Sequence, residues 1–142
     1  YYTEAIELEK DNLVKSGLLT KLATLEMASD SKQAARDFAK AAYSLDPTNG
    51  YALFIIAESY AGARIGEAFE NQTVYWVVVD YLVRARNTDP TLKEQIDERI
   101  TVYTRLFPTK EEAFFRSLVE EGVSYYVGGW VNESTTIRFR KE

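Results

Sequence analysis

A short phrase that occurs twice constrains the fold of this chain more than any other feature. Residues 44–50 read SLDPTNG and residues 87–93 read NTDPTLK, so an Asp-Pro pair follows a run of helix-forming residues in both places. Proline lacks an N–H and disfavours a helical conformation in the residue before it, so Asp46 and Asp89 are predicted helix ends. The chain is therefore expected to stop and restart its helices, with each Asp-Pro as a joint.

The composition fits a soluble globular domain. Hydrophobic residues make up 46% of the 142 positions and charged residues 27%, which is ordinary for a chain that folds around one core. The formal net charge is −5, and the only cluster of basic residues is the short RFRK at 138–141. Because phosphate binding needs a clustered Lys/Arg surface, we expect no nucleic-acid partner.

The absence of two residue types limits the chemistry. The chain contains neither cysteine nor histidine, which removes thiolate nucleophiles, Ser-His and Cys-His pairs and the usual zinc ligands. Carboxylate pairs, lysine and tyrosine remain as catalytic groups to consider, and calcium or magnesium as ions. The loop carboxylates Glu67 and Glu70 match no calcium-loop spacing. We therefore predict no catalytic residue, no metal site and no cofactor.

No apolar run is long enough to predict a membrane span. A spanning helix needs about 20 apolar residues, whereas the most hydrophobic segment, 74–83, has Asp80 in its middle. Arg84 lies one helical turn after Asp80, so we expect these two side chains to form an ion pair on a solvent-facing surface. The sequence begins at Tyr1 inside a helical pattern, and we expect the true N-terminus, with any signal peptide, to be missing.

Internal similarity gives the strongest indication of architecture. A shift of 34 residues aligns one stripe of apolar positions: Leu19 with Leu53, Leu22 with Ile56 and Ala23 with Ala57. A shift of 43 residues aligns a further set: Leu53 with Ile96, Ala57 with Ile100, Tyr60 with Tyr103, Ala35 with Val78, Ala42 with Ala85 and Pro47 with Pro90. The chain is therefore predicted to contain similar helical units, the second with an insertion of about nine residues. Tyr60 and Tyr103 are expected in the core.

The sequence resembles the tetratricopeptide repeat (TPR) family, whose unit of 34 residues is a pair of helices. In AARDFAKAAYSLDP, the family's small positions and closing proline are filled by Ala35, Ala42 and Pro47. In GYALFIIAESYAGA, its leucine, leucine, small and tyrosine positions are filled by Leu53, Ile56, Ala57 and Tyr60. Glu26, Ala39 and Arg99 depart from the pattern, as the ends of solenoids commonly do. The resemblance implies an all-α helical-repeat solenoid of antiparallel helix pairs, with a short C-terminal β-hairpin after it.

The expected map has TPR-like repeats over residues 1–108 and a C-terminal helix and hairpin, packed on the repeats, over 109–142. Helices are expected at about 2–14, 16–29, 32–45, 50–63, 71–88 and 91–106. One turn is lengthened by the segment 62–73, where GARIGEAFEN has two glycines and no clear apolar period. We expect this insertion to project as a loop, and loops added to rigid scaffolds often carry recognition.

The chain changes character after Pro108. TKEEAFFRSLVEEG begins like a helix, with Thr109 as N-cap and Glu112 as its capping-box partner. VSYYVGGWVNESTTIRFRK then alternates in the manner of two strands, joined near residues 132–134 or 128–129. A two-stranded hairpin is marginally stable alone. We therefore expect it to cover the open end of the solenoid with its apolar side chains, namely Tyr125, Val127, Trp130, Ile137 and Phe139.

The tail is similar to the C-terminal end of a group of largely uncharacterised TPR proteins from Bacteroidetes bacteria. The likeness lies in FPTKEEAFF followed by YYVGGWVNESTTIRFR, and together with the repeats it covers roughly residues 30–142. It implies an exported protein that is periplasmic or associated with the cell envelope. The absence of cysteine is compatible with that location.

In the TPR family, the first helices of successive units line a concave groove that binds peptides or proteins. By register, this groove is expected to be lined by Thr20, Thr24 and Met27 from the first unit, Tyr51, Phe54 and Glu58 from the second, and Asp97, Thr101 and Arg105 from the third. A secondary partner surface is expected at the insertion and hairpin, from Arg64, Glu67, Tyr75, Trp76 and Trp130. Amphipathic aromatic residues such as Tyr75 and Trp76 are expected to be partly buried in any case.

These features lead to three hypotheses of function. The first is a non-enzymatic scaffold that binds a peptide or protein partner through the concave face. The second is a structural component of an envelope assembly that self-associates, through the hairpin or the truncated end of the repeats, into a homo-oligomer. The third is an enzyme that works through carboxylates alone, which needs two carboxyl groups about 5–9.5 Å apart in a deep pocket. The sequence offers no such pair.

Overall fold

The protein is mostly helical and ends in a small antiparallel β-hairpin, as a computed structural model that describes residues 2–118 and 120–141 shows. Its helices are α1 (Tyr2–Leu8), α2 (Asn12–Ala28), α3 (Lys32–Leu45), α4 (Gly50–Tyr60), α5 (Ala68–Thr88), α6 (Lys93–Thr104) and α7 (Lys110–Phe114). A 3-10 turn, η1 (Pro90–Leu92), precedes α6, and the strands are β1 (Ser124–Val127) and β2 (Glu133–Thr136). Helices and a C-terminal hairpin were both predicted, and both are confirmed.

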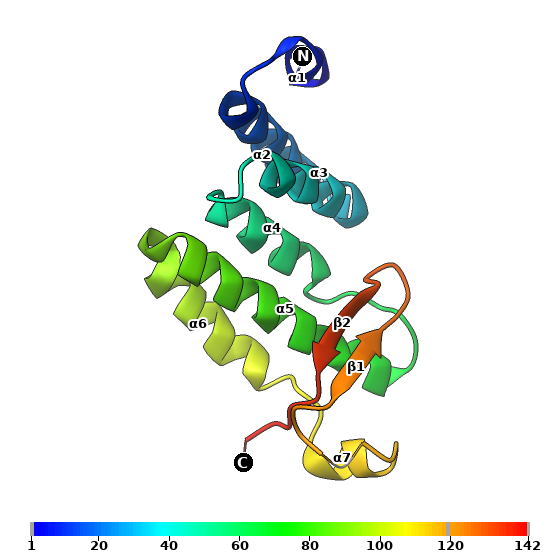
Figure 1. Cartoon of the computed structure of the whole chain (residues 1–142). Helices are drawn as coiled ribbons and strands as arrows, with labels where there is room; N and C mark the ends of the chain where they lie inside the picture. The colour runs from blue at the N-terminus through cyan, green and yellow to red at the C-terminus, as the bar shows by residue number, and fades with distance from the viewer. Residues whose placement is uncertain (1, 119, 142) are drawn as a thin grey trace.

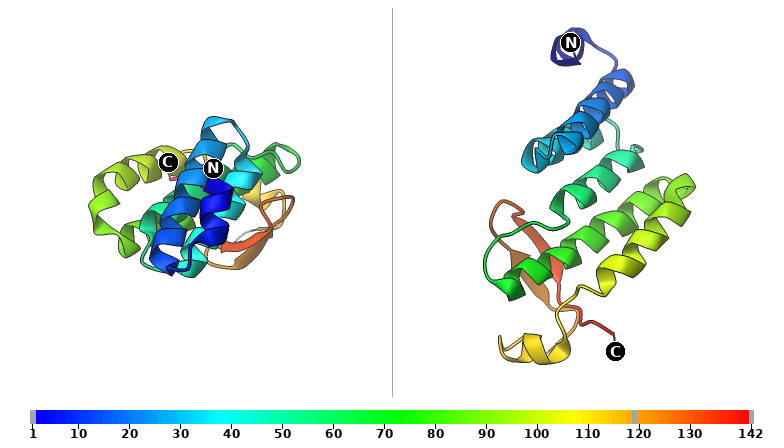
Figure 2. Two further views of the ribbon diagram at one scale, coloured as in Figure 1. Left: turned by 90° about the horizontal axis from the view of Figure 1, so that it is seen from above. Right: turned by 180° about the vertical axis from the view of Figure 1, so that it is seen from behind.

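Helices that follow one another in the chain also pack on one another. Contacts join α2 to α3, α3 to α4, α4 to α5 and α5 to α6. The views in Figures 1 and 2 agree that these helices succeed each other along an elongated molecule, with α1 at one end and α7 at the other. The interior between them contains residues of the predicted stripe, with Ala23, Leu53, Ile56, Ala57, Tyr60, Val78 and Ile96 all buried. The core position of Tyr60 is thus confirmed, while Tyr103 is half-buried.

Both Asp-Pro joints end a helix in the same way. Asp46 follows α3 and its Oδ1 accepts hydrogen bonds from the N–H and the hydroxyl of Thr48, at 3.0 and 2.6 Å. Asp89 follows α5 and accepts the same two bonds from Thr91, at 3.1 and 2.6 Å. The two joints also lie against each other. Gly50, at the end of the first joint, is so close to Asp89 in the second that a Cβ added to Gly50 would lie only 2.6 Å from the Cβ of Asp89. The predicted helix ends are confirmed.

The first two helices differ from the expected ranges of 2–14 and 16–29. Helix α1 ends at Leu8, and α2 begins at Asn12. The break arises because Asp11 acts as the N-cap of α2, its Oδ1 accepting from the N–H of Leu13 at 2.8 Å. Glu9 secures the turn before it, accepting from the N–H groups of residues 10 and 11.

The insertion is a helical extension more than a loop, so the expectation of a loop over 62–73 was wrong in its extent. Helix α5 already begins at Ala68. In the register that aligns the units by 43 residues, the start of α3 at Lys32 corresponds to Tyr75, so 68–74 is an added stretch of α5. Only the segment before it is irregular, and Asn71 folds this segment onto the helix by accepting from the N–H groups of Ile65 and Gly66 at 2.7 and 3.2 Å.

The hairpin lies along α5 and not over the end of the helix stack, which corrects its expected position (Figure 1). Ser124 pairs with Thr136 and Val127 with Glu133, so the connection runs over 128–132. The turn at 128–129 is confirmed, and the alternative at 132–134 is wrong because β2 begins at Glu133. The capping box before α7 is confirmed by bonds of 3.0 and 3.1 Å between residues 109 and 112.

Candidate functional site

Five of the nine predicted groove residues surround one hollow between α2 and α4. This hollow has a volume of about 150 Å³ and is lined by Thr24, Met27, Tyr51, Phe54, Ile55 and Glu58. Helical periodicity places these side chains on one face of each helix, and the packing of α2 against α4 brings the two faces together. We call this feature the α2–α4 hollow.

Aromatic rings give the α2–α4 hollow an apolar wall with an accessible edge. The rings of Tyr51 and Phe54 stack with their centroids 5.7 Å apart. Tyr51 is 39% exposed, whereas Phe54 is only 6% exposed and packs into the core. Met27 packs against the same core and is partly buried. The wall is therefore fixed from below by Phe54 and open to solvent at Tyr51.

The polar rim of the hollow is fixed by α6. Glu58 receives Nη1 of Arg99 at 2.6 Å on one oxygen and the hydroxyl of Tyr103 at 2.8 Å on the other. Burial, together with the hydrogen bond to Glu58, raises the pKa of Tyr103 to about 12. The charge of Glu58 raises the pKa of Arg99. The guanidinium of Arg99 also lies 5.8 Å from the centre of the Phe54 ring.

Sequence reasoning missed Arg99 and Tyr103 as neighbours of the hollow. Their signal was present, because Arg99 stands where the repeat pattern expects a leucine. A charged residue at a position that faces the preceding helix needs a partner there, and Glu58 supplies it.

The third-unit residues are not part of the hollow. Asp97 points to α5, where Arg86 binds it at 2.6 Å, and Lys93 binds its other oxygen at 2.6 Å. These two cations lower the pKa of the Asp97 carboxyl. Thr101 and Arg105 line a different pocket on the far flank of α6.

Thr20, the remaining predicted groove residue, belongs to a joint. Its hydroxyl accepts a hydrogen bond from Nδ2 of Asn49 at 2.9 Å and donates to the Ser16 carbonyl at 2.8 Å. Asn49 is the N-cap of α4, so this contact ties α2 to the first turn of α4. Thr20 therefore holds the two walls of the hollow in position and does not line it.

Three of the predicted secondary-surface residues meet in a shallow depression. Arg64, Glu67 and Tyr75 line a depression of about 580 Å³, together with residues of the same loop, the start of α5, Leu106 and Arg140. Arg64 and Glu67 are exposed. Tyr75 stacks on Tyr103 with centroids 5.5 Å apart, so it connects this depression to the rim of the α2–α4 hollow.

The two tryptophans do not join that surface. Trp76 is fully buried, which corrects its assignment as a surface residue. Its indole N–H donates to the Arg138 carbonyl at 2.7 Å and its ring packs edge-on against Tyr125. Trp130 is half-buried, over the Tyr60 ring and under the guanidinium of Arg36. Both side chains secure the hairpin.

The expected ion pair between Asp80 and Arg84 does not form. Asp80 instead binds Nη2 of Arg138 at 2.9 Å and accepts the Thr135 hydroxyl at 2.5 Å. Arg84 lies over the rings of Tyr81 and Tyr43, at 4.9 and 5.6 Å from their centres. A partner 58 positions away in the sequence therefore replaces the local one.

Glu133 is the centre of a polar cluster that the sequence did not reveal. Its Oε2 accepts from Lys40 at 2.8 Å, Tyr60 at 2.8 Å and Tyr81 at 2.6 Å. Burial and the bonds to Glu133 raise the pKa of both tyrosines. Because three donors from three helices bind this one oxygen, the cluster fastens the hairpin to α3, α4 and α5.

No family model matches the chain, and no curated protein and no solved structure matches it either. Within the described part of the chain, no helix is long and apolar enough to cross a membrane. The same residues contain no group of three or more acidic side chains placed to hold a metal ion. The α2–α4 hollow is thus the place where sequence pattern and geometry agree on a candidate site.

Proposed function

We propose that this protein is a non-enzymatic interaction module that binds a peptide segment of a partner, with one apolar side chain of the peptide anchored in the α2–α4 hollow. The observation that carries the proposal is the gathering of Thr24, Met27, Tyr51, Phe54 and Glu58 around a single hollow. Its residues come from the two helices that the repeat pattern assigns to the same face.

The proposed architecture is a TPR-like array in which α2–α3 and α4–α5 are successive units and α6 starts a third. The identical Asp46 and Asp89 joints support it. The hydrogen bonds of Asn49 to Ser16 and Thr20 support it further, because they link the first helices of two units. In such an array the first helices form a continuous binding face.

The chemistry of the hollow favours an apolar anchor over a charged one. Its walls are an aromatic pair and a flexible thioether, Met27, which adapts to side chains of different shape. Its one carboxylate, Glu58, is neutralised by Arg99, so a cationic side chain gains little there. A small number of buried aromatic contacts commonly supplies most of the energy of such interfaces.

Selection from a random peptide library on the intact chain, followed by calorimetry of the selected peptides, tests the proposal. We expect the selected peptides to share an apolar residue and to bind Tyr51→Ala at least tenfold more weakly, since truncating a hot-spot aromatic costs about 2 kcal/mol or more. Phe115→Ala is the matched control, because Phe115 is an 84% exposed aromatic residue directly after α7, away from the hollow. Peptides that bind Tyr51→Ala as tightly as the original chain would exclude the hollow.

Self-association is the second candidate function, and one surface favours it. Leu8, Leu13 and Val14 are 81%, 65% and 48% exposed at the α1–α2 end of the molecule. An isologous contact between two such ends would bury these side chains. Light scattering tests it, with Leu13→Lys as the variant: a dimer that this change dissociates supports self-association, and a monomer at high micromolar concentration contradicts it.

A further inference from the structure

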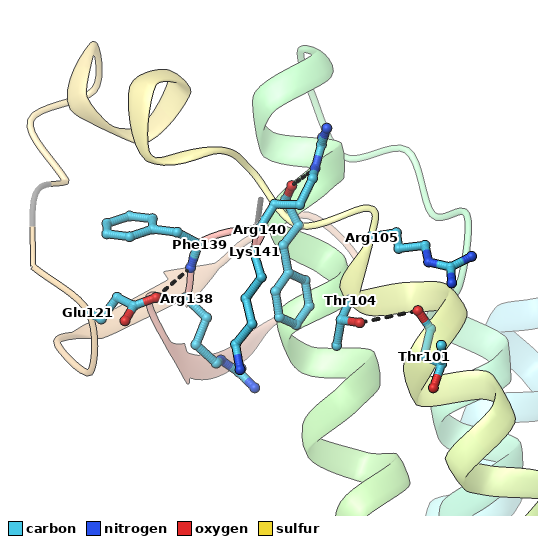
Figure 3. Close-up of a pocket in the computed structure, with 9 residues that line it drawn as sticks. Thr101, Thr104, Arg105, Glu121, Arg138, Phe139, Arg140 and Lys141 are labelled. Atoms are coloured by element: carbon cyan, nitrogen blue, oxygen red, sulfur yellow. Dashed lines mark hydrogen bonds between the residues drawn. The ribbon is translucent and has the colours of Figure 1, made fainter.

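A further pocket, larger than the α2–α4 hollow, lies between the end of α6 and the C-terminal segment (Figure 3). Its volume is about 520 Å³, which is within the usual range for sites that bind small molecules. It is lined by Thr101, Thr104, Arg105, Phe107, Glu121, Arg138, Phe139, Arg140 and Lys141. We call it the α6 pocket.

The charge of the α6 pocket is opposite to that of the whole chain. Four of its lining residues are Arg or Lys and one is Glu, whereas the chain carries a formal net charge of −5. The carboxylate of Glu121 is already engaged, because its Oε1 accepts the N–H of Phe139 at 2.9 Å. A concave surface with an excess of one charge raises the local concentration of ligands of the opposite charge.

Two of the four cations are fixed by the protein itself. Arg138 binds Asp80 at 2.9 Å and donates to the Trp76 carbonyl at 2.9 Å. Arg140 donates from Nε to the Phe107 carbonyl at 3.0 Å. These bonds hold the C-terminal segment against α5 and against the residues that follow α6, so the protein itself fixes the positions of two of the lining cations.

The other two cations are Arg105 and Lys141. Within residues 2–118 and 120–141, neither has a carboxylate partner at ion-pair distance. Figure 3 shows the Lys141 side chain extending in the same direction as that of Arg138, while Arg105 extends away from them at the rim. Lys141 and Arg105 are therefore the two lining cations whose charges are available to a ligand.

The remaining walls are apolar or lack free donors. Phe107 is 5% exposed, with the Arg138 guanidinium 5.5 Å from its ring centre, and Phe139 is half-buried. The hydroxyls of Thr101 and Thr104 donate to carbonyls of α6. A ligand that suits these walls has an anionic group to meet the cations and an apolar body to lie against the aromatic rings.

We infer that the α6 pocket binds a small organic anion, in which a carboxylate or phosphate is carried on an apolar ring or chain. The site is separate from the α2–α4 hollow and shares no lining residue with it. Lys141, which has no carboxylate partner among the described residues, contacts the anionic group beside Arg138, and Phe139 contacts the apolar body.

Calorimetric titration of the full chain with phenyl phosphate and with benzoate tests the inference and distinguishes the two anionic groups. We expect saturable binding of at least one of them, weakened by added salt because the attraction is between charges. Benzyl alcohol, which has the ring without the charge, is expected not to bind. Absence of saturable binding by both anions at millimolar concentration would overturn the inference.

The variant Lys141→Gln tests whether the anion binds in the α6 pocket. Loss of one charged contact weakens binding by about tenfold, and Lys141 is exposed, so its replacement leaves the fold intact. Lys21→Gln, an exposed lysine on α2, is the matched control and is expected to bind like the original chain. Arg64→Gln tests whether the neighbouring depression is the real site. Equal affinities of Lys141→Gln and Lys21→Gln, or a loss confined to Arg64→Gln, would contradict the inference.

Discussion

Glu133 accepts hydrogen bonds from Lys40, Tyr60 and Tyr81, which come from three different helices. Tyr81 is 8% exposed, so Glu133→Ala leaves its buried hydroxyl without this acceptor. We expect the free energy of unfolding to fall by about 1–3 kcal/mol, the usual cost of such a group. Chemical denaturation followed by circular dichroism measures it. Ser134→Ala, an exposed neighbour in β2, is the control, and equal stabilities of the two variants would contradict the role of Glu133.

The same carboxylate predicts a dependence of stability on pH. Burial works to raise the pKa of Glu133, but hydrogen bonds from Lys40, Tyr81 and Tyr60 outweigh it and hold the pKa below its ordinary value of 4.5. A carboxyl group with a lowered pKa stabilises the fold above its unfolded pKa, and this contribution is lost as pH falls through the folded pKa.

We therefore expect the free energy of unfolding to decrease below pH 4.5 with a component that Glu133→Gln lacks, because the amide cannot be protonated in this range. Denaturation curves at a series of pH values, from neutral to below the folded pKa, measure the two slopes. A decrease of the same size in both proteins would show that other carboxyl groups account for the acid sensitivity.

Two glycines are expected to respond in opposite directions to replacement by alanine. A Cβ on Gly50 would meet the Cβ of Asp89 at 2.6 Å, so Gly50→Ala is expected to cost about 1–3 kcal/mol through overpacking. Gly17 lies within α2 with nothing inside 4 Å of the added atom, so Gly17→Ala is expected to stabilise by up to about 1 kcal/mol. Thermal denaturation of both variants measures the difference, and a change of the same sign would contradict the contact between the joints.

Among the elements, α5 has the largest structural task. Its added first turns carry the chain to Trp76, whose indole N–H and carbonyl exchange hydrogen bonds with Arg138. Asp80, one turn later, holds the same arginine. These contacts with α5 give the two-stranded hairpin the support that it needs to be stable.

Arg138→Ala is expected to loosen the hairpin without unfolding the helices at the other end of the chain. It removes the partner of Asp80 and the bond to the Trp76 carbonyl, while no hydrogen bond or ion pair of the Arg138 side chain in the described residues reaches α2 or α3. Amide hydrogen exchange of 124–136 should become faster by at least tenfold, with exchange in α2 unchanged. Equal acceleration in both regions would show that the molecule opens as one unit.

Helix ends set by neighbouring residues could be predicted from the sequence, whereas contacts between distant segments could not. The Asp46 and Asp89 joints depend on the proline that follows each, which is visible locally. The partner of Asp80 lies beyond the hairpin turn, so the nearest basic residue, Arg84, was the natural but wrong expectation. Asp11 was missed as a helix N-cap because the surrounding pattern continues the helix on both sides.

At the scale of the whole molecule, the sequence register predicted the candidate site correctly in α2 and α4 but not in α6. Residues that this register places on one face of α2 and on one face of α4 meet in the α2–α4 hollow. In α6, a charged residue replaces the expected leucine, and Arg99 turns to Glu58 while Asp97 turns to α5. The sequence register alone does not predict which side chains these two charged residues bind.

The single methionine of the chain, Met27, lines the α2–α4 hollow and provides the most direct test of peptide binding there. With a ¹³C-labelled methionine methyl group, the protein gives one NMR signal that comes from the hollow itself. We predict that a peptide selected on the intact chain shifts this signal with the same saturation curve that calorimetry gives for binding. A peptide that binds by calorimetry and leaves the Met27 signal unmoved would contradict the proposal that the hollow is the binding site.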